Sequence, residues 1–245
     1  MLIIAHRGAS GYAPENTMVA FLLAYQQKAD GVELDVHLTA DGEIVICHDD
    51  ALERTSNCRG ELRKKTLAEL KRYDFGSWFG TQFSGEKIPS FAEFWDWFVT
   101  TDENFIVNIE IKNGPYIHHG IEQKLLDIIY SKPIKNPYDR IIVSCFHHNT
   151  LNKVKAVDAQ IKTALLFEGT PVDVVSMCKQ SGPSEYIHPC YSSLDNAMIA
   201  AAKSADIGVN TWTVNTVEQL EYVKQFNLTG VITNYPDRAR AALEK

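Results

Sequence analysis

Short runs of apolar, mostly β-branched residues alternate with longer amphipathic segments along almost the whole chain. Such short runs are typical of buried strands, and apolar positions repeating every three or four residues are typical of helices. The pattern predicts strands at residues 2–6, 32–38, 105–111, 140–145, 162–167, 186–190, 207–214 and 230–233. It predicts helices after them at residues 16–28, 91–99, 117–131, 149–157, 171–179, 194–204, 215–225 and 236–243.

A succession of eight strand–helix units is typical of an α/β protein with a parallel sheet. A chain of 245 residues also has the usual size of a closed (β/α)8 TIM barrel. An open, doubly wound sheet is the alternative. No G-x-G-x-x-G motif follows the first strand, which weakens the dinucleotide-binding form of that alternative. We therefore expect residues 1–245 to form a single barrel domain.

One stretch interrupts the alternation after the second strand. An Asp-Gly turn at residues 41–42 returns the chain through 43–47 as a hairpin-like extension of that strand. Residues from about 49 to 89 are then polar and glycine-rich, with one helical piece at 66–73. We interpret them as a small insertion. Its aromatic residues could form a lid over the site or the insertion's own core, and the second interpretation is favoured; they are Phe75, Trp78, Phe79 and Phe83.

The second strand carries acids on one of its faces. Its apolar side chains fall on one side, and Glu33, Asp35 and His37 fall on the other. Glu33 and Asp35 would lie roughly 6–7 Å apart, and like charges so close are costly to bury without a cation between them. The stretch predicts either a divalent-metal site or an ordinary amphipathic strand with its acids in water. Taken alone, it favours the ordinary strand.

Polar residues at the other strand ends change that balance, because the active site of a (β/α)8 barrel lies at the C-terminal ends of its strands. The pattern places there His6, Arg7, Glu33, Asp35, His48, Glu110, Lys112 and Trp212. Three acids from neighbouring strands can surround one Mg²⁺ or Ca²⁺, since both ions prefer oxygen ligands. The two histidines then remain free for proton transfer, and Arg7 and Lys112 can donate to phosphoryl oxygens. This set suits the cleavage of a phosphodiester.

The motifs around these residues resemble those of the glycerophosphodiester phosphodiesterase family, nearly from end to end. They are His6-Arg7-Gly8-Ala9, Pro14-Glu15-Asn16-Thr17, Glu33-Leu34-Asp35-Val36, His48-Asp49, Glu110-Ile111-Lys112 and Trp212-Thr213-Val214-Asn215, with Gly76-Ser77-Trp78-Phe79, Gly85-Glu86 and Ile88-Pro89 in the insertion. The resemblance implies a (β/α)8 barrel with a small inserted subdomain. It also implies one divalent cation, Mg²⁺ or Ca²⁺, held by Glu33, Asp35 and Glu110, and catalytic roles for His6 and His48.

The resemblance further implies a reaction. Glycerophosphodiesters such as glycerophosphocholine or glycerophosphoethanolamine would be hydrolysed to sn-glycerol 3-phosphate and an alcohol. Arg7 and Lys112 would bind the phosphate, with simple pairing to the acids as the alternative, and Trp212 would wall the glycerol group, with core packing as the alternative. A phospholipase-D-like enzyme acting on lysophospholipids or sphingomyelin is the nearest rival function. A non-catalytic module for phosphorylated ligands is a second rival, which the intact set of acids and histidines disfavours.

Composition limits the partners and the compartment. The formal net charge is −7 and no basic run occurs, so we expect no nucleic-acid partner. The apolar start at residues 2–5 is too short for a signal-peptide core or a membrane span, so we expect no stable membrane insertion. Five cysteines without C-x-x-C or zinc spacing are typical of reduced thiols. We expect a cytoplasmic monomer or homodimer, although a leader removed ahead of Met1 would leave the same sequence.

Other residues near the site have ordinary expected roles. His37 lies beyond the acids on their strand and is expected to be a hairpin residue rather than a metal ligand. The pairs His118-His119 and His147-His148 are expected to lie in solvent, in loops or at helix starts. Cys47, next to His48, is the thiol to test for reactivity, but a small residue facing the core is the favoured interpretation.

Overall fold

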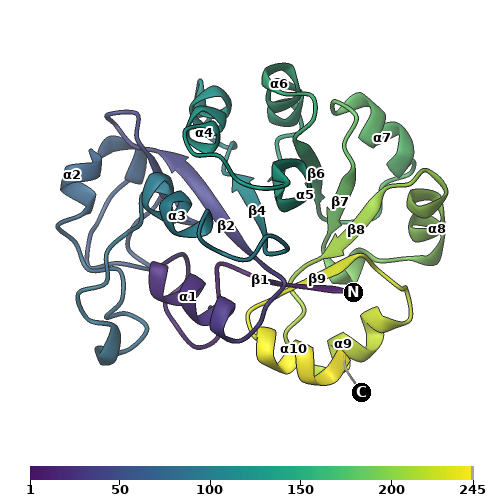
Figure 1. Ribbon diagram of the computed structural model, residues 1–245, viewed down its shortest axis with the longest axis horizontal. Helices are drawn as coiled ribbons and strands as arrows, with labels where there is room; N and C mark the ends of the chain where they lie inside the picture. Colours follow the sequence, from purple (N-terminus) through teal and green to yellow (C-terminus); the bar gives the residue numbers. More distant parts are fainter. Residues whose placement is uncertain (244–245) are drawn as a thin grey trace.

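Eight parallel strands close on themselves in the computed structural model, which describes residues 1–243 (Figure 1). They are β1 (Leu2–Ala5), β2 (Gly31–Leu38), β4 (Ile106–Ile111), β5 (Ile141–Cys145), β6 (Lys162–Phe167), β7 (Tyr186–Pro189), β8 (Gly208–Thr211) and β9 (Gly230–Thr233). Each strand pairs with the next one of this series, and β1 pairs with both β9 and β2, which closes the ring. The predicted (β/α)8 TIM barrel is therefore confirmed.

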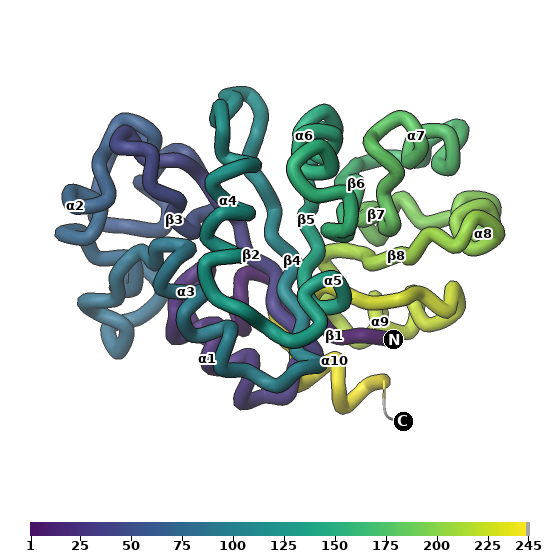
Figure 2. The backbone as a smooth tube through the Cα atoms, turned by 45° about the horizontal axis from the view of Figure 1, so that its top comes forward, coloured from purple at the N-terminus to yellow at the C-terminus, as the bar shows by residue number. Residues whose placement is uncertain are grey.

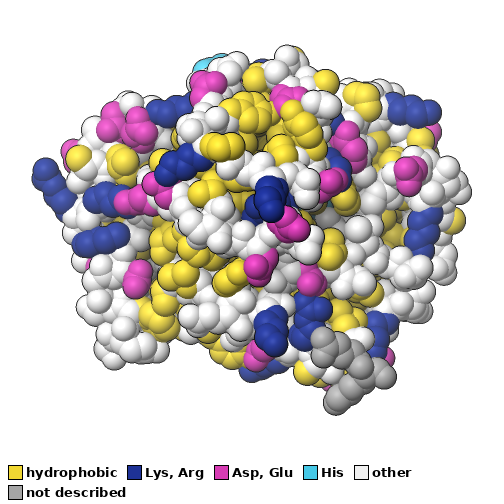
Figure 3. Space-filling model, in the orientation of Figure 1, with side chains coloured by type: hydrophobic (Ala, Val, Ile, Leu, Met, Phe, Trp, Pro, Cys, Tyr) yellow, Lys and Arg dark blue, Asp and Glu magenta, His cyan; other side chains and the backbone are white. Residues whose placement is uncertain are grey.

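Helices connect the strands and surround the barrel, as both backbone views show (Figures 1 and 2). They are α1 (Met18–Gln26), α3 (Phe91–Phe98), α4 (Ile121–Tyr130), α5 (Pro137–Arg140), α6 (Asn149–Val157), α7 (Val174–Gln180), α8 (Asn196–Ser204), α9 (Val217–Lys224) and α10 (Pro236–Leu243). Helix α7 begins three residues later than predicted. Acidic and basic side chains are interspersed over the face shown in Figure 3.

Helices α1 and α9 each begin two residues later than predicted because the polar side chains at residues 16 and 215 are engaged elsewhere. Helix α1 is capped by Thr17, since the Asn16 side chain donates to Asp35 at 2.8 Å. Helix α9 is capped by Thr216, since Asn215 Oδ1 accepts from the backbone of the segment that follows β9. In both cases a contact distant in sequence outweighs the local capping preference.

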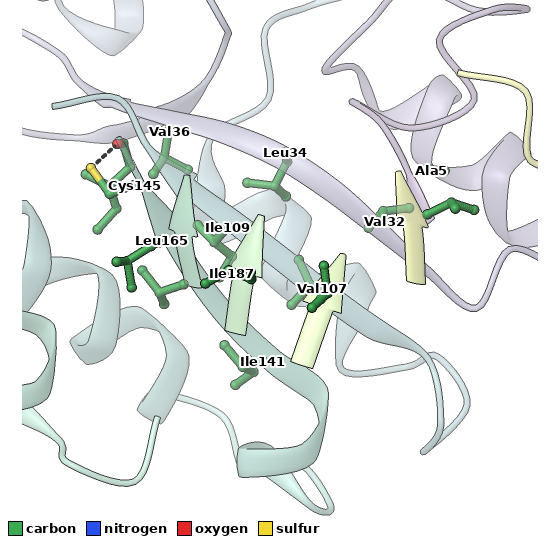
Figure 4. Packing of buried hydrophobic residues seen from close by; sticks show 14 of the residues in the cluster. Ala5, Val32, Leu34, Val36, Val107, Ile109, Ile141, Cys145, Leu165 and Ile187 are labelled. Carbon is green, nitrogen blue, oxygen red and sulfur yellow. Dashed lines mark hydrogen bonds between the residues drawn. The ribbon is translucent and has the colours of Figure 1, made fainter. Parts of the chain in front are cut away.

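The main core lies between the outer face of the barrel and the helices. Apolar side chains that alternate along β2 and β4, including Leu34, Val36 and Ile109, are fully or almost fully buried there. Figure 4 shows these residues beside Leu165 and Ile187 of later strands. Alternation explains the arrangement, because the same strands must turn every second side chain toward the inside of the barrel.

The extra strand β3 (Ile44–Ile46) pairs antiparallel with the end of β2 and leads into the interrupted region. That region contains the short helices η1 (Leu62–Lys64), α2 (Leu67–Leu70) and η2 (Thr81–Phe83). It lies to one side of the barrel near α3 (Figures 1 and 2). A second apolar cluster fills it: Val45, Cys47, Leu52, Cys58, Leu62, Leu70, Phe75 and Ile88. Trp78 is 40% exposed and packs edge-to-face on Phe79, so only Phe75 of the predicted aromatic group joins this core.

Both apolar and polar side chains fill the inside of the barrel. One apolar cluster there consists of Ile4, Ile106, Ile142, Ala164 and Ile232. The buried polar side chains include His188, whose Nε2 accepts a hydrogen bond from Asn210 at 3.0 Å. Burial lowers the pKa of His188 to about 3. The ring is therefore held neutral inside the barrel.

The low pKa of His188 predicts that the fold loses stability in acid. In the unfolded chain its imidazole protonates below about pH 6.5, whereas in the folded barrel it protonates only at about pH 3. Between these values the unfolded state binds more protons, so the free energy of unfolding falls as the pH falls, by up to about 1.4 kcal/mol per pH unit from this group. We expect His188→Gln, which keeps an acceptor for Asn210, to flatten this dependence in urea titrations. The exposed His119→Gln should leave it unchanged, and equal slopes for His188→Gln and wild type would contradict the prediction.

Candidate active site

The eight residues predicted at the strand ends gather at one mouth of the barrel. Seven of them line a cavity of about 60 Å³, which we call the inner cavity; its full lining is His6, Arg7, Glu33, His48, Asn108, Glu110, Lys112, Phe146, Leu166, Trp212 and Ile232. Asp35 lies behind this lining and is fully buried. The residues come together because parallel strands of a barrel end on the same side.

The three predicted metal-ligating acids form one cluster. An oxygen from each of Glu33, Asp35 and Glu110 lies within 4.8 Å of the other two. The register of β2 against β4 pairs Asp35 with Glu110, so both side chains point into the barrel at the same level. Because Mg²⁺ and Ca²⁺ bind oxygen at about 2.0–2.6 Å, ligand atoms spaced in this way can share one ion.

Two cations contact the acid cluster. Lys112 Nζ lies 2.7 Å from Glu110 Oε1 and 3.5 Å from Asp35 Oδ1. Arg7 Nε lies 3.4 Å from Asp35 Oδ2, and the Arg7 backbone N–H donates to Glu33 Oε2 at 2.9 Å. When all three acids are ionised, two cations leave one negative charge unbalanced.

Burial and mutual repulsion separate the acidities of these carboxyl groups. Burial raises the pKa of Glu33 well above its usual range, and the charges of Asp35 and Glu110 add to the effect. Burial also raises the pKa of Glu110 to about 7, although Lys112 opposes it. Burial acts on Asp35 in the same direction, but Lys112 and Arg7 outweigh it and hold the pKa of Asp35 below its usual range.

The cluster fits a divalent cation on its own chemistry. Asp35 Oδ1 is buried and has no hydrogen-bond donor among residues 1–243. Among these residues, only the Lys112 ammonium lies near it, at 3.5 Å, and a buried carboxylate oxygen without a hydrogen bond is costly, so a cation would satisfy it. All three candidate ligands are carboxylates, the type that Mg²⁺ and Ca²⁺ prefer over nitrogen or sulfur.

The two histidines present the same ring nitrogen. His6 Nδ1 donates to Asn234 Oδ1 at 2.7 Å, and His48 Nδ1 donates to the Asp49 carboxylate. Burial, with Arg7 beside the ring, lowers the pKa of His6 to about 4. Burial also lowers the pKa of His48, although Asp35 opposes it. Both rings are therefore neutral with Nε2 as an acceptor, the form that a general base requires.

Sequence reasoning gave no role to the residues that hold this machinery in place. Glu15 accepts from Arg7 at 2.8 Å and from Arg54 at 2.7 Å, and Arg54 in turn donates to Asp49 at 2.6 Å. A chain of ion pairs thus runs from His48 through the interrupted region to Arg7. Glu15 and Asp49 belong to motifs that the resemblance identified, whereas Arg54 carried no sequence signal.

Two aromatic rings form the apolar wall of the inner cavity. Trp212 and Phe146 pack edge-to-face with their centroids 5.7 Å apart. Trp212 Nε1 donates to the backbone oxygen of His188 at 2.7 Å, which fixes the orientation of the indole. Trp212 was predicted at this position, whereas Phe146 is a single aromatic residue after β5 that no pattern distinguished.

The expectation that His118 lies in solvent is wrong. Its side chain is buried, and its Nε2 lies 3.0 Å from His37 Nδ1. His37 Nε2 lies 3.0 Å from the backbone oxygen of His48 and must donate, because a carbonyl oxygen only accepts. Burial lowers the pKa of His37 to about 4, so the ring is neutral and its Nδ1 accepts from His118.

A larger cavity of about 260 Å³ lies beside this histidine pair, and we call it the outer cavity. Its lining consists of His37, His48, Asp50, Lys112, Gly114, Pro115, Tyr116 and His118. The inner and outer cavities share His48 and Lys112 as walls. The barrel mouth therefore offers two neighbouring spaces on either side of one imidazole and one ammonium group.

The fold and this mouth are those of a barrel enzyme that acts on phosphoric diesters. The chain matches the glycerophosphoryl diester phosphodiesterase family over residues 6–238. It is 37% identical to a glycerophosphodiester phosphodiesterase of Caldanaerobacter subterraneus subsp. tengcongensis, over 96% of this chain and 95% of that protein. It is 31% identical to one from Bacillus subtilis, over 97% of this chain and 84% of that protein.

A solved structure agrees with these relatives. An Oleispira antarctica phosphodiesterase in complex with the product sn-glycerol-3-phosphate matches with a TM-score of 0.89 and 29% identity, over 100% of this chain and 97% of that one. The chain therefore belongs to the glycerophosphoryl diester phosphodiesterase family and is a phosphoric diester hydrolase, which confirms the resemblance seen in its motifs. Within residues 1–243, no helix has the length and apolar character needed to cross a bilayer.

Cysteine reactivity offers a test of the site's packing. Cys47 is buried next to His48, and burial, with Glu15 and Asp49 nearby, raises its pKa to about 12. Because the thiolate is the reactive form, we expect iodoacetamide at about pH 8 to leave Cys47 unmodified and to label the half-buried Cys190 first, as read by peptide mass spectrometry. In urea all five cysteines should react. Labelling of folded Cys47 as fast as Cys190 would contradict the packing described.

Proposed function

We propose that this enzyme hydrolyses water-soluble glycerophosphodiesters, such as glycerophosphocholine and glycerophosphoethanolamine, to sn-glycerol 3-phosphate and an alcohol. The observation that carries the proposal is the clustering of three buried carboxylates within 4.8 Å, between two cations and beside two neutral imidazoles. We assign Glu33, Asp35 and Glu110 to one divalent cation, Mg²⁺ or Ca²⁺.

Charge balance supports this assignment. Three ionised acids with Arg7 and Lys112 carry a formal charge of −1. A divalent cation would change that charge to +1, which matches the single negative charge of a phosphodiester. With all three acids ionised and no cation, the same site would repel its substrate, because electrostatic attraction in a low-dielectric pocket depends on the net charge nearby.

The cation would act as a Lewis acid that polarises a phosphoryl oxygen and lowers the pKa of the glycerol 2-hydroxyl. One of the pair His6 and His48 takes the proton of that hydroxyl as its oxygen attacks phosphorus. The other takes up a proton from solvent, because the approaching phosphate anion favours the imidazolium form, and donates that proton to the departing alcohol oxygen as that P–O bond breaks. Water then opens the cyclic phosphate with the roles reversed. Arg7 and Lys112 hold the non-bridging oxygens.

Direct attack by water on phosphorus is the alternative route to the same products. The two routes differ in one species, because only the first forms a 1,2-cyclic glycerol phosphate. Phosphorus NMR of early time points distinguishes them.

The size of the inner cavity favours free glycerol over an acylated one. Its volume is about 60 Å³, and Phe146, Leu166 and Trp212 close its apolar side. The aromatic residues Trp78 and Phe79 line neither cavity, so within residues 1–243 they provide no acyl platform at the mouth. These features argue against lysophospholipids and sphingomyelin as the preferred substrates.

We also infer the setting in which the enzyme works. Residues 1–245 would act as one catalytic domain with the insertion at about 49–89, as a monomer or homodimer. All five cysteines are unpaired, as is usual for proteins in the reducing cytoplasm, and this supports a cytoplasmic location. The net charge of −7 and the interspersed surface charges in Figure 3 support a small-molecule substrate rather than nucleic acid.

Removal of the cation is expected to abolish turnover. After treatment with a chelator and dialysis, release of glycerol 3-phosphate should fall by at least about 100-fold, because the polarising charge is lost. Mg²⁺ or Ca²⁺, but not Na⁺, should restore it. Full turnover in the dialysed enzyme would exclude the metal assignment.

Loss of either histidine is expected to lower kcat without loss of the cation. His6→Ala and His48→Ala should each reduce kcat by about 10²–10⁴-fold, the range of general acid–base catalysis. Calorimetric titration should still detect cation binding in both variants. The exposed His119→Ala is the matched control and should keep wild-type kcat. Near-normal kcat in either variant would exclude that residue as a proton carrier.

A further inference from the structure

The proposed reaction uses the inner cavity and leaves the outer cavity without a role. A phosphodiester has two ester arms that leave phosphorus in different directions, so its binding site needs two spaces with the phosphate between them. The outer cavity shares with the inner one the groups that would handle phosphate and proton, Lys112 and His48. Its position is therefore that of a site for the second arm.

We propose that the outer cavity binds the departing alcohol, and that it selects small alcohols whose far end donates hydrogen bonds, such as ethanolamine or glycerol, over choline. This inference rests on the proposed function. It adds a head-group site formed by Asp50, Tyr116 and His118, which come from the interrupted region and from the loop between β4 and α4.

The assignment of the two arms follows from enclosure and size. The inner cavity is lined by Glu33 and Glu110 of the acid cluster and by the rings of Phe146 and Trp212, so it suits the invariant glycerol arm. The outer cavity is larger, at about 260 Å³ against about 60 Å³, and Tyr116 at its edge is 46% exposed. A variable arm needs the larger space with an open side. The two cavities together lie near the lower end of the roughly 300–1,000 Å³ usual for small-molecule sites.

The lining of the outer cavity includes two side chains that can accept hydrogen bonds, those of His118 and Asp50. The hydrogen bonds between the histidines define the first acceptor. His37 donates to the backbone oxygen of His48 and accepts from His118 Nε2. The other ring nitrogen of His118, Nδ1, therefore carries no proton and can accept a hydrogen bond. Asp50 supplies the other. Its contacts with Arg63 are long, at 3.3 Å to the backbone nitrogen and 3.4 Å to Nε, so its carboxylate keeps accepting capacity. Both groups would pair with a donor at the end of the alcohol.

Choline meets a less suitable environment. Its quaternary ammonium donates no hydrogen bond and is usually bound by open aromatic faces. The ring of Tyr116 already carries the guanidinium of Arg63, whose carbon lies 3.7 Å from the ring centroid. Choline therefore leaves the acceptors of Asp50 and His118 without donors, whereas an ethanolamine ammonium group or a glycerol hydroxyl would pair with them.

The test compares three substrates in one metal-containing buffer: glycerophosphoethanolamine, glycerophosphoglycerol and glycerophosphocholine. Release of glycerol 3-phosphate gives kcat/KM for each. We expect the first two to exceed the choline ester by at least about tenfold, the size of one charge-assisted hydrogen bond. The choline ester also serves as the internal control, because damage to the fold or to the catalytic groups lowers all three values together.

Two variants test the two proposed acceptors, Asp50 and His118, one at a time. Asp50→Asn keeps an oxygen for the Arg63 backbone but loses the charge, so it should lower kcat/KM for the ethanolamine ester by about tenfold and for the glycerol and choline esters by less. His118→Phe should lower both donor esters relative to the choline ester. The exposed Glu53→Gln in the same region is the matched control and should change no ratio.

The outcomes distinguish this inference from the function on which it rests. If none of the three esters is hydrolysed, the proposed function and the head-group site both fail. If all three are hydrolysed with similar kcat/KM, or if Asp50→Asn and His118→Phe lower all three equally, the function stands and the head-group site is excluded. Selective loss of the donor esters supports it.

Discussion

Repulsion among three carboxylates is the constraint around which the barrel mouth is built. The register of β2 against β4 forces Glu33, Asp35 and Glu110 into one buried cluster, because inward-facing positions on neighbouring strands cannot avoid each other. Burial of like charges is unfavourable unless nearby opposite charges compensate for their repulsion. Arg7 and Lys112 offset only two of the three, so the free protein keeps a site that is incomplete without a further cation or a proton.

The interrupted region contributes to the arrangement of charges at the barrel mouth. Arg54 lies within it and joins Glu15, which holds Arg7, to Asp49, which holds His48. The orientations of His48, the proposed proton carrier, and Arg7, the proposed phosphate ligand, are thus connected through one side chain outside the barrel strands. A catalytic group held by such contacts keeps its geometry only while the supporting residues keep theirs.

The sequence predicted what depends on short-range periodicity and missed what depends on distant contacts. Alternation along residues 32–38 was enough to place the acids and the apolar side chains on opposite faces of the strand. The burial of His118 was not predictable, because it depends on His37, 81 residues earlier in the chain. The first helix was predicted to begin at residue 16, two residues too early, for a similar reason: the hydrogen bond from Asn16 to Asp35 cannot be read from a local pattern. Periodicity reports which face a residue occupies and not which partner it meets there.

The two cavities are lined by different kinds of structure. The inner cavity is lined largely by strand residues and their immediate continuations, whose positions are fixed by the hydrogen bonds of the barrel. The outer cavity is lined largely by loops, where substitutions cost the fold little. Substitutions around Tyr116 can therefore alter the space for the alcohol while the acid cluster and Lys112 stay in place. A barrel arranged in this way can keep one phosphate chemistry and vary the group that it releases.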